Sequence, residues 1–316
     1  MRIVIALGGN ALLRRGQSMD QAVQQRNIEA AVRSIAALAA DHELVITHGN
    51  GPQVGLLSLA HEATGDARSY TLDVLGSETQ GMIGYLLEDA LRDALHDREI
   101  ASLLTQVVVD PADTAFARPT KPIGPRYAED VARRLAAERG WTIAEDGEAF
   151  RRVVASPEPL RIVELAAIRI LIDHGVLVIC GGGGGVPVVA APDGASYGVE
   201  AVVDKDLTAA LLAQEIDADL LLLLTDVRAV ESGWRTAAAR LIRSATPQAL
   251  RSEHFAAGTM GPKVEAACRF VEATGKRAAI GSLEDAVAIV DGRVGTSVTP
   301  DGASPLSFWD DAVASE

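Results

Sequence analysis

The sequence predicts an α/β fold with a mainly parallel sheet, and two observations carry this prediction. Short runs of apolar residues at consecutive positions are typical of strands that are covered on both faces. Longer segments of helical periodicity alternate with these runs, as they do in proteins built from strand–helix units. The predicted strands are Ile3–Leu7, Leu44–Thr47, Leu103–Val109, Val176–Cys180 and Leu220–Thr225. The predicted helices are Met19–Ala40, Thr79–His96, Ile162–His174 and Leu207–Glu215.

The limits of these strands come from the charged residues and glycines around them. Arg2 and Glu43 precede the first two runs, and glycines follow both. Asp110 ends the third run, Gly181–Gly185 ends the fourth, and Asp219 precedes the fifth. The helical segments between them are dominated by Ala and Leu, which suits helices that pack closely on a sheet.

Two segments interrupt the alternation. Asp110–Gly124 is rich in proline and leads into Tyr127–Pro159, which is charged and poorly periodic. We predict a protruding lid or small subdomain at approximately residues 112–160, inserted within a single domain of residues 1–316. Between Pro187 and Val203, the turn Ala191–Gly194 separates two short β-like runs and predicts a hairpin.

The composition limits the class of protein. The 316 residues carry 29 Lys and Arg against 43 Asp and Glu, a formal net charge of −14. A charge this negative argues against nucleic acid or an anionic membrane as partner. The hydrophobic fraction of 48% excludes a disordered chain. The two cysteines lack the spacing of a metal site, so we predict no metal ligands in the chain. Few cysteines and no predicted membrane-spanning stretch are typical of a cytoplasmic protein.

Glycines gather where three predicted strands end, and this pattern points to an anion site. The ends are Gly8-Gly9-Asn10, His48-Gly49-Asn50-Gly51 and Gly181–Gly185. Open α/β sheets bind ligands beyond the carboxyl ends of their strands, where glycine amides and helix N-termini favour negative charge. For a single Gly pair, a tight turn is the preferred explanation. Three such ends in one chain favour anion binding, since a turn rarely needs five glycines in a row.

Familiar nucleotide and hydrolase motifs fail on spacing. Gly275-Lys276-Arg277 lacks the upstream glycine and the hydroxyl of a P-loop, and the glycines after His48 miss the Rossmann pattern by one residue. Gly194–Gly198 matches GxSxG, but it follows a predicted hairpin turn and not a strand that leads into a helix. His42-Glu43 and His61-Glu62 lack the second histidine of a zinc protease.

The remaining signal is a set of charged residues in loops and at helix starts. Asp204-Lys205-Asp206 precedes an Ala- and Leu-rich helix, so either aspartate is explained as an N-cap or as a site residue. Lys263 stands at a predicted helix start, where a cation opposes the helix dipole unless an anion lies there too. Lys121 stands alone in the proline-rich entrance to the lid.

At these residues the sequence resembles the carbamate kinases, a family of the amino-acid kinase superfamily. Thr120-Lys121-Pro122-Ile123-Gly124-Pro125 and Val203-Asp204-Lys205-Asp206 are specific to that family, whereas Gly8-Gly9-Asn10 and Thr225-Asp226-Val227 are shared more widely. The resemblance covers nearly the whole chain. Its other segments are Ala6–Ala11, His48–Gly55, Gln80–Tyr85, Leu104–Pro111, Gly181–Gly185, Gly198–Asp206 and Met260–Ala267.

The resemblance implies a three-layer αβα sandwich, a homodimer, and Mg²⁺-dependent phosphoryl exchange between ADP and carbamoyl phosphate, giving ATP and carbamate. It carries over the catalytic residues Lys121, Lys205, Asp206 and Lys263. It places the substrate and the transferred phosphoryl group on Gly8, Gly9, Asn10, His48, Gly49, Asn50, Gly51, Gly181, Gly182 and Gly183. It places the nucleotide on Asp204, Lys205, Thr225, Asp226, Val227, Met260 and Lys263.

Two other functions remain as alternatives. Related kinases of acyl substrates carry a lysine just before the first Gly-Gly, where this chain has Ala6-Leu7, and this argues against an acetylglutamate-type kinase. A non-catalytic nucleotide-binding module would not need the catalytic lysines of the family. Lys121, Lys205 and Lys263 are all present here, which argues against such a module. The chain departs from the family pattern at Ala149–Pro157 and at Ala257, away from the expected phosphoryl ligands.

Overall fold

The central sheet of the computed structural model has ten strands in the order β13-β14-β16-β15-β12-β1-β2-β9-β3, with β17 paired to β14. The structure describes residues 1–13, 17, 20–63, 70–191, 194–234, 236, 238–255, 260–302 and 304–310. The strands from β15 to β3 run parallel to one another. Their bounds are β1 Arg2–Leu7, β2 Glu43–His48, β3 Ile100–Ser102, β9 Leu177–Ile179, β12 Leu220–Thr225, β13 Glu231–Ser232, β14 Arg240–Ala245, β15 Arg277–Ser282, β16 Thr296–Val298 and β17 Leu306–Phe308.

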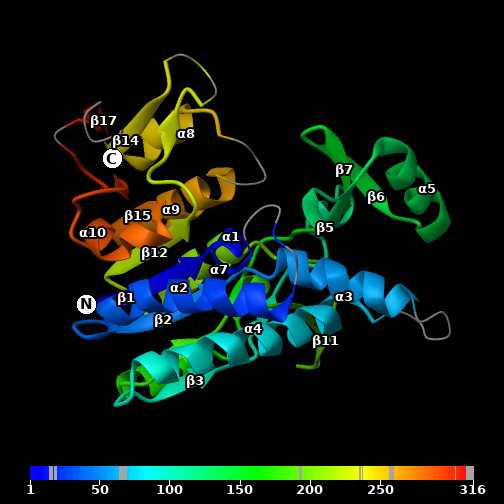
Figure 1. The fold of residues 1–316 in the computed structure, drawn as a ribbon, viewed down its shortest axis with the longest axis horizontal. Helices are drawn as coiled ribbons and strands as arrows, with labels where there is room; N and C mark the ends of the chain where they lie inside the picture. Colours follow the sequence, from blue (N-terminus) through cyan, green and yellow to red (C-terminus); the bar gives the residue numbers. More distant parts are fainter. Residues whose placement is uncertain are drawn as a thin grey trace.

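Helices cover both faces of this sheet, so the predicted α/β fold is confirmed as three layers (Figure 1). Because side chains alternate along a strand, Val4 and Ala6 of β1 enter one core, with helices α6, α7 and α9, while Ile3, Ile5 and Leu7 enter the other, with α2, α4 and α10. The helices are α1 Gly9–Leu12, α2 Gln21–Ala39, α3 Gly51–Ala63, α4 Leu72–Ala94, α5 Glu129–Arg139, α6 Leu165–Asp173, α7 Lys205–Glu215, α8 Pro247–Ser252, α9 Met260–Thr274 and α10 Ala286–Val290.

A second sheet extends the body beyond the end of β9. It has the order β11-β10-β4-β8, with bounds β4 Gln106–Val108, β8 Arg161–Ile162, β10 Val186–Ala190 and β11 Ser196–Gly198. The antiparallel pairing of β10 with β11 confirms the predicted hairpin; Pro192 and Asp193 of its turn lie outside the described residues. Ser196 of the GxSxG match lies in β11 and is exposed, so it has no strand-to-helix elbow.

The predicted strand Leu103–Val109 is wrong as a single element, because the chain leaves the central sheet within it. β3 ends at Ser102 and β4 begins at Gln106 in the second sheet. Between them, the Thr105 amide donates to Gln80 Oε1 at 2.9 Å, and the Thr105 carbonyl accepts from Gln80 Nε2 at 3.1 Å. The Thr105 carbonyl also accepts from the Val186 amide of β10 at 2.8 Å, so Thr105 is bound by a side chain of α4 and by the first strand residue of the second sheet.

Two predicted helices begin at other residues than expected. The segment predicted as Thr79–His96 is part of α4, which starts at Leu72, where Glu200 Oε2 accepts from the Leu72 amide at 2.8 Å. The segment predicted as Ile162–His174 is α6, which starts only at Leu165 because Ile162 pairs with Val107 in β8. Strands β1, β2, β9 and β12, and helices α2 and α7, confirm the other predictions to within two residues.

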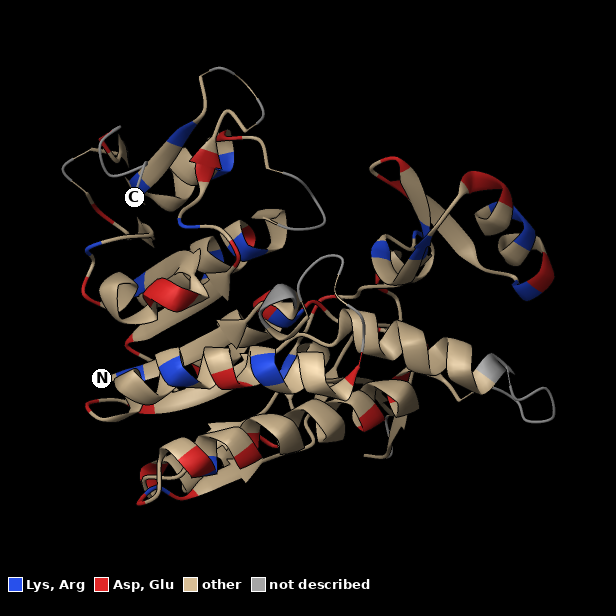
Figure 2. Cartoon of the chain, in the orientation of Figure 1, with Lys and Arg blue, Asp and Glu red and all other residues tan. Residues whose placement is uncertain are grey.

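Residues between β4 and β8 form a separate small sheet, β5-β7-β6, with helix α5 on it. Its strands are β5 Lys121–Tyr127, β6 Thr142–Asp146 and β7 Ala149–Val154. Figure 1 shows this unit standing apart from the main body beside α3, and Figure 2 shows basic and acidic residues interleaved along α5. We refer to residues 121–154 as the lid, although its function as a lid remains a prediction.

The lid meets α3 through a contact between two glycine backbones. A Cβ atom on Gly55 of α3 would lie 2.0 Å from Gly124 Cα and 2.2 Å from Gly124 N. Gly124 has a φ of +69°, which also favours glycine there. Because the neighbouring atoms are backbone, a larger residue at position 55 has to push the whole strand β5 away from α3.

We therefore expect Gly55→Ala to displace the lid and lower kcat by about tenfold or more, since small misplacements of reacting groups are costly. Steady-state kinetics and thermal unfolding check this. Gly81→Ala is the matched control, because a Cβ on Gly81 of α4 meets nothing within 4 Å. Unchanged kcat in Gly55→Ala would contradict a fixed seat for the lid on α3.

Candidate active site

The loops that follow four parallel strands meet at one edge of the central sheet. The strand order places β12, β1, β2 and β9 side by side, and all four run in the same direction. Their carboxyl ends lead into Asp226, Gly8, Gly49 and the glycine run at Gly181–Gly185. The three glycine-rich ends predicted from the sequence are thus brought together at this edge.

Gly8 and Gly49 do not offer their amides to a ligand, contrary to the expectation that the glycine amides are unpaired. The Gly8 amide donates to the Leu224 carbonyl at 2.9 Å, and the Gly49 amide donates to the Leu7 carbonyl at 3.1 Å. These bonds extend the sheet ladder by one residue on each side. A Cβ on Gly49 would lie 3.1 Å from Gly9 N and 3.4 Å from Lys205 Cδ, so the glycine lets β2 pack closely against the site.

The glycine run has a conformational and packing reason that the sequence pattern did not show. Gly183 has a φ of +66°, and a Cβ there would lie 2.2 Å from Asn50 Nδ2. A Cβ on Gly182 would lie 2.5 Å from the His48 imidazole. The run is buried and folds over these two side chains of the β2 loop. Among the described residues the Gly182 and Gly183 amides have no hydrogen-bond partner, whereas the Gly181 amide donates to Thr105 Oγ1 at 2.9 Å.

His48 and Asn50 are buried polar residues that the fold holds in place. Asn50 Nδ2 donates to Thr79 Oγ1 of α4 at 2.8 Å. His48 Nδ1 lies 3.2 Å from the Gly49 carbonyl, so Nδ1 carries the proton in the neutral ring. Burial, with a smaller contribution from the Lys205 charge, lowers the pKa of His48 to about 4. His48 is therefore neutral near pH 7.

Asp206 joins two buried lysines at the start of α7. Its carboxylate accepts from Lys205 Nζ and, through Oδ2, from Lys263 Nζ of α9 at 3.1 Å. Burial alone would raise the pKa of Asp206, but the two ammonium groups hold it far below its usual range. Burial likewise opposes the charge on Lys263, yet Asp206 raises the pKa of this lysine above its usual value. A lysine near the start of a helix is unfavourable unless an anion lies beside it, and the carboxylate of Asp206 is such an anion for Lys263.

Lys205 differs from Lys263 in that its surroundings lower its pKa. Burial, opposed by Asp206 and reinforced by the positive charge of Lys263, lowers the pKa of Lys205 to about 8. A lysine with this pKa is mostly protonated at pH 7. Lys205 is buried, and its ammonium group donates to the carboxylate of Asp206. It therefore gains from any further negative charge that a ligand brings.

Asp204 is the N-cap of α7, one of the two roles that the sequence left open, and it also binds a lysine of the lid. Its Oδ1 accepts from the Asp206 amide at 2.9 Å and the Leu207 amide at 3.4 Å, which makes it the N-cap of α7. Its Oδ2 accepts from Lys121 Nζ of the lid. One buried aspartate therefore caps the helix and receives the lid lysine at the same edge of the sheet.

The residues predicted for the nucleotide lie on neighbouring elements. Thr225 ends β12, and its Oγ1 donates to Asp226 Oδ1 at 3.1 Å. Asp226 contributes to the raised pKa of Lys263, which places it close to the buried lysines. Val227 is exposed just beyond the strand, and Met260 is the first residue of α9. Gly9 and Asn10 begin α1, and the side chain of Asn10 lies outside the described residues.

Sequence reasoning missed the polar residues that support the site from α4. Thr79 receives the Asn50 amide, and Gln80 holds Thr105, whose hydroxyl in turn receives the Gly181 amide. The available signal was the position of Thr79 and Gln80 at helical spacing from Leu75, Ile83 and Leu87, which places two polar residues on the apolar face of the helix. These side chains fix the loops and do not add charge to the site.

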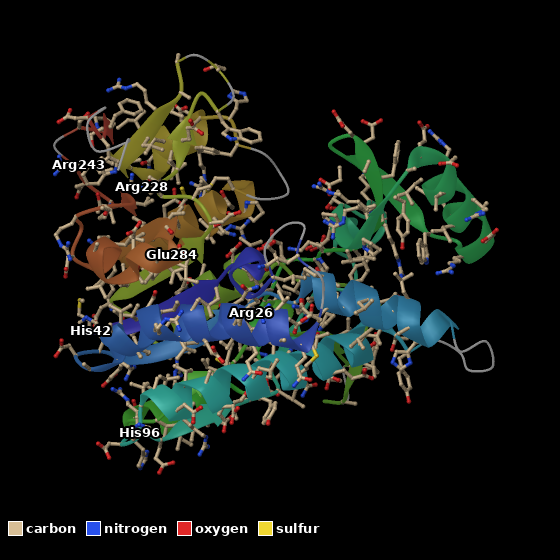
Figure 3. All side chains as sticks on the ribbon, viewed as in Figure 1. Arg26, His42, His96, Arg228, Arg243 and Glu284 are labelled. Carbon is tan, nitrogen blue, oxygen red and sulfur yellow. The ribbon has the colours of Figure 1, made fainter. Side chains whose placement is uncertain are left out.

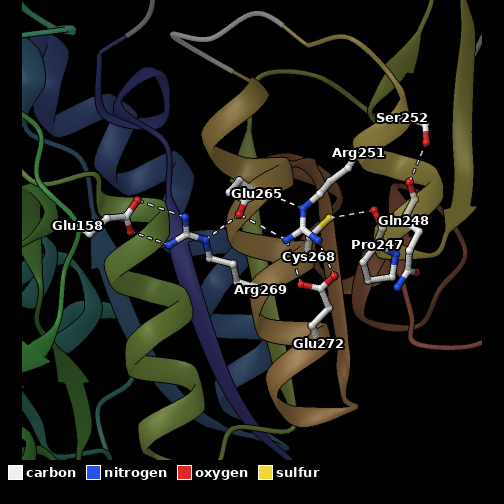
Figure 4. A network of polar contacts seen from close by, with 9 residues as sticks. All are labelled: Glu158, Pro247, Gln248, Arg251, Ser252, Glu265, Cys268, Arg269 and Glu272. Atoms are coloured by element: carbon white, nitrogen blue, oxygen red, sulfur yellow. Dashed lines mark hydrogen bonds and ion pairs between the residues drawn. The ribbon is translucent and has the colours of Figure 1, made fainter. Parts of the chain in front are cut away.

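A polar network ties the exit of the lid to the helix that carries Lys263 (Figure 4). Arg269 of α9 binds Glu158 through both guanidinium nitrogens at 2.6 and 3.2 Å, and it also binds Glu265 at 2.7 Å. The Glu158 amide donates to Asp113 Oδ2 at 2.9 Å, so the chain segments that enter and leave the lid are joined at this point. Bidentate pairs within a network are the surface ion pairs that fix geometry best.

Other candidate chemistry does not gather in the described part of the chain. Among the described residues there is no group of three or more His, Cys, Asp or Glu suited to a metal ion. Cys180 and Cys268 are buried free thiols, and burial raises the pKa of each to about 12. His42 lies at the far end of the sheet, beside the N-terminus and away from the lid (Figure 3). The described helices include none with the length and apolar character needed to span a membrane.

We expect Asp206→Asn to lower kcat by about tenfold or more, because a neutral amide no longer holds Lys205 as a cation. The melting temperature should change little. Asparagine keeps the side-chain volume and one acceptor oxygen, and Lys205 can release its proton when the negative charge of Asp206 is removed. Steady-state kinetics and thermal unfolding of one preparation check both parts. A large loss of stability with kcat retained would make Asp206 a purely structural residue.

Comparison with known proteins places this site in a family. The model of the amino acid kinase family matches residues 1–282. The carbamate kinase of Rhizobium meliloti is 51% identical over 95% of this chain and 93% of its own length, and that of Pyrococcus furiosus is 46% identical over 95% and 99%. The structure of carbamate kinase from Giardia lamblia bound to AMP-PNP has a TM-score of 0.86 at 40% identity, covering 95% of this chain and 98% of its own. This chain therefore belongs to the amino acid kinase family and, within it, to the carbamate kinases.

Proposed function

We propose that this chain catalyses reversible, direct in-line phosphoryl transfer between carbamoyl phosphate and ADP, giving ATP and carbamate. The observation that carries the proposal is the convergence of three lysines from three segments, Lys121, Lys205 and Lys263, on two carboxylates at one edge of the sheet. Full-length similarity to carbamate kinases supports the same reaction.

The charge of the site suits two anionic reactants. At ~4 Å, each pair of like unit charges repels by about 4 kcal/mol at an effective dielectric constant near 20. Three ammonium groups against Asp204 and Asp206 leave the group one positive charge in excess. Phosphoryl transfer depends on alignment and on neutralising the phosphoryl oxygens. Because the carbamate oxygen is already ionised, the reaction needs no general base.

We assign the roles by position. Lys121 and Lys205 contact the phosphoryl and carbamate oxygens, and Lys263 contacts the nucleotide phosphates. Asp206 orients Lys205 and Lys263, as its hydrogen bonds to both suggest. Asp204, Thr225, Asp226, Val227 and Met260 surround the nucleotide. The transferred group lies between the β1 loop (Gly8, Gly9, Asn10), the β2 loop (His48, Gly49, Asn50, Gly51) and Gly181, Gly182 and Gly183, of which Gly182 and Gly183 retain unpartnered amides among the described residues.

The donors at the site fit Mg²⁺ that arrives with the nucleotide. Asp204 and Asp206 are occupied by lysines, and the described residues hold no ready cluster of carboxylates. Mg²⁺ in kinases is often held by substrate phosphates and water with one or two carboxylates. The nucleotide phosphates would hold it, and the exposed carboxylate of Asp226 would be its protein contact, which departs from the sequence prediction of no metal ligand in the chain. When bound, it supplies positive charge to the phosphate oxygens.

A coupled assay of ATP formation from ADP and carbamoyl phosphate tests the function. We expect turnover that depends on both substrates and on Mg²⁺. ATP with acetylglutamate is the control pair, and we expect no turnover with it. Turnover with acetylglutamate alone would favour a kinase of another carboxylate. Binding of ADP without turnover of either pair would favour a nucleotide-binding module.

We further propose a cytoplasmic homodimer. Buried free thiols agree with a reducing compartment. Large apolar side chains on α4, Met82 and Tyr85, are exposed at 38% and 65%, and a second subunit would cover such residues. Sedimentation equilibrium decides the oligomeric state, and a monomer at micromolar concentration would contradict the dimer.

A further inference from the structure

The lid rests on one short segment of the body through two ion pairs. Lys121 of β5 binds Asp204, and Arg152 of β7 lies 3.5 Å from Glu200 through Nη2 and Oε1. The two acceptors are four positions apart in the chain, directly before α7. The two cations lie on neighbouring strands, since Lys121 pairs with Val154 and Ile123 pairs with Arg152.

Arg152 has more partners on the body than Lys121 does. Its Nη1 donates to Ser58 Oγ of α3 at 3.1 Å, while Nη2 faces Glu200. Its guanidinium carbon lies 5.1 Å from the centre of the Trp141 ring, which belongs to the lid. The Arg152 side chain is only 17% exposed. One planar cation therefore joins the lid, α3 and the segment before α7, a task that suits arginine better than lysine.

Substrate binding is expected to affect the Lys121–Asp204 and Arg152–Glu200 ion pairs differently. In the proposed function, Lys121 contacts the phosphoryl oxygens, so its bond to Asp204 weakens when the substrate binds. The Arg152 contacts involve neither the glycine loops nor the buried lysines, and they persist. Glu200 is itself held, because its Oε2 accepts from the Leu72 amide at the start of α4.

We propose that Arg152 is a positioning residue for phosphoryl transfer: with Glu200 and Ser58 it keeps the lid seated after Lys121 has exchanged Asp204 for the substrate. This inference rests on the proposed function. It separates two tasks within the lid, since Lys121 neutralises the phosphoryl group and Arg152 fixes where Lys121 can reach.

The test compares Arg152→Met with Arg126→Met. Both remove one cation from the lid, but the only partner of Arg126 among the described residues is Asp146, which is itself in the lid, at 2.9 and 3.1 Å. We expect Arg152→Met to lower kcat at least about tenfold and to raise KM for carbamoyl phosphate, because a loosened lid misplaces the reacting groups. ADP affinity by calorimetry should stay within about twofold, and Arg126→Met should resemble the wild type. Equal kinetics in the two variants would overturn the proposal.

Two further variants guard against simple misfolding. Arg152→Lys keeps the charge and should recover part of kcat. Glu200→Gln keeps an acceptor for the Leu72 amide and should reproduce part of the Arg152→Met defect. The double variant should be no worse than Arg152→Met alone, because the two residues act through one contact. Fully additive losses in the double variant would contradict a shared role.

Hydrogen exchange gives a readout that needs no turnover. Amides of β5 and β7 should exchange faster in Arg152→Met than in Arg126→Met, with the central strands unchanged. If the wild type does not act on carbamoyl phosphate, the proposed function is wrong. The exchange result still tests whether Arg152 holds the lid against the body. If the wild type is active and lid exchange is the same in both variants, the inference about Arg152 fails by itself.

Discussion

Replacing Lys121 with alanine is expected to lower kcat by at least about a hundredfold, the loss seen when one charge-stabilising donor is removed from an active site. Lys121 is the only cation that the lid places on Asp204 among the described residues, and the body provides no lysine just before Gly8 to replace it. If the roles proposed above hold, its removal leaves Lys205 and Lys263 as the remaining lysines of the site. The measurement is the initial rate of ATP formation at saturating ADP and carbamoyl phosphate.

The same variant should fold normally and bind ADP as the wild type does. Asp204 keeps its bonds to the Asp206 and Leu207 amides without Lys121, so α7 retains its cap. Arg133→Ala is the control within the lid, because the described partners of Arg133 of α5 are Glu129 and the Phe150 ring, and both belong to the lid. Near-normal turnover in Lys121→Ala, with circular dichroism and ADP binding intact, would remove the lid lysine from the mechanism.

Local patterns predicted the central sheet well where the sequence carries the whole reason for a strand. Leu220–Thr225 is buried at every position and bounded by Asp219 and Asp226, and its predicted limits are those of β12. Leu103–Val109 has apolar residues on both sides of Thr105 and Gln106, but the chain leaves the central sheet there, where Gln80 from a distant helix binds both backbone groups of Thr105. No pattern within the segment records that contact.

The candidate site divides in the same way. Glycines at strand ends predicted which loops lie together, because parallel strands bring their carboxyl ends to the same edge. What the glycines do was not predictable, since it depends on side chains packed from elsewhere: His48 and Asn50 lie under the glycine run. Likewise, the sequence left Asp204 open between a cap and a site residue, and only the placement of Lys121, distant in sequence, shows that it is paired with the lid.

Lys205→Ala is expected to lower kcat by at least about a hundredfold as well, but it should also change how activity depends on pH. Because burial lowers the pKa of Lys205 to about 8, the free wild-type enzyme loses this cation as the pH rises through that value. The plot of kcat/KM against pH reports groups of the free enzyme, so it should fall above about pH 8. The residual activity of Lys205→Ala should lack that alkaline limb.

Stability should move in the opposite direction, and this distinguishes a catalytic lysine from a structural one. Between the lowered pKa of Lys205 and its unfolded value, the unfolded chain holds a proton that the folded chain has released, so the free energy of unfolding gains from Lys205 as the pH rises from about 8 toward 10. Urea titrations of the wild type and of Lys205→Ala at pH 7 and 9.5 measure this difference. Lys276→Ala is the control, because Lys276 pairs with the exposed Asp217 away from the site. If activity and stability of the wild type fell together above pH 8, the alkaline limb would report unfolding, and Lys205 would lose its assigned role.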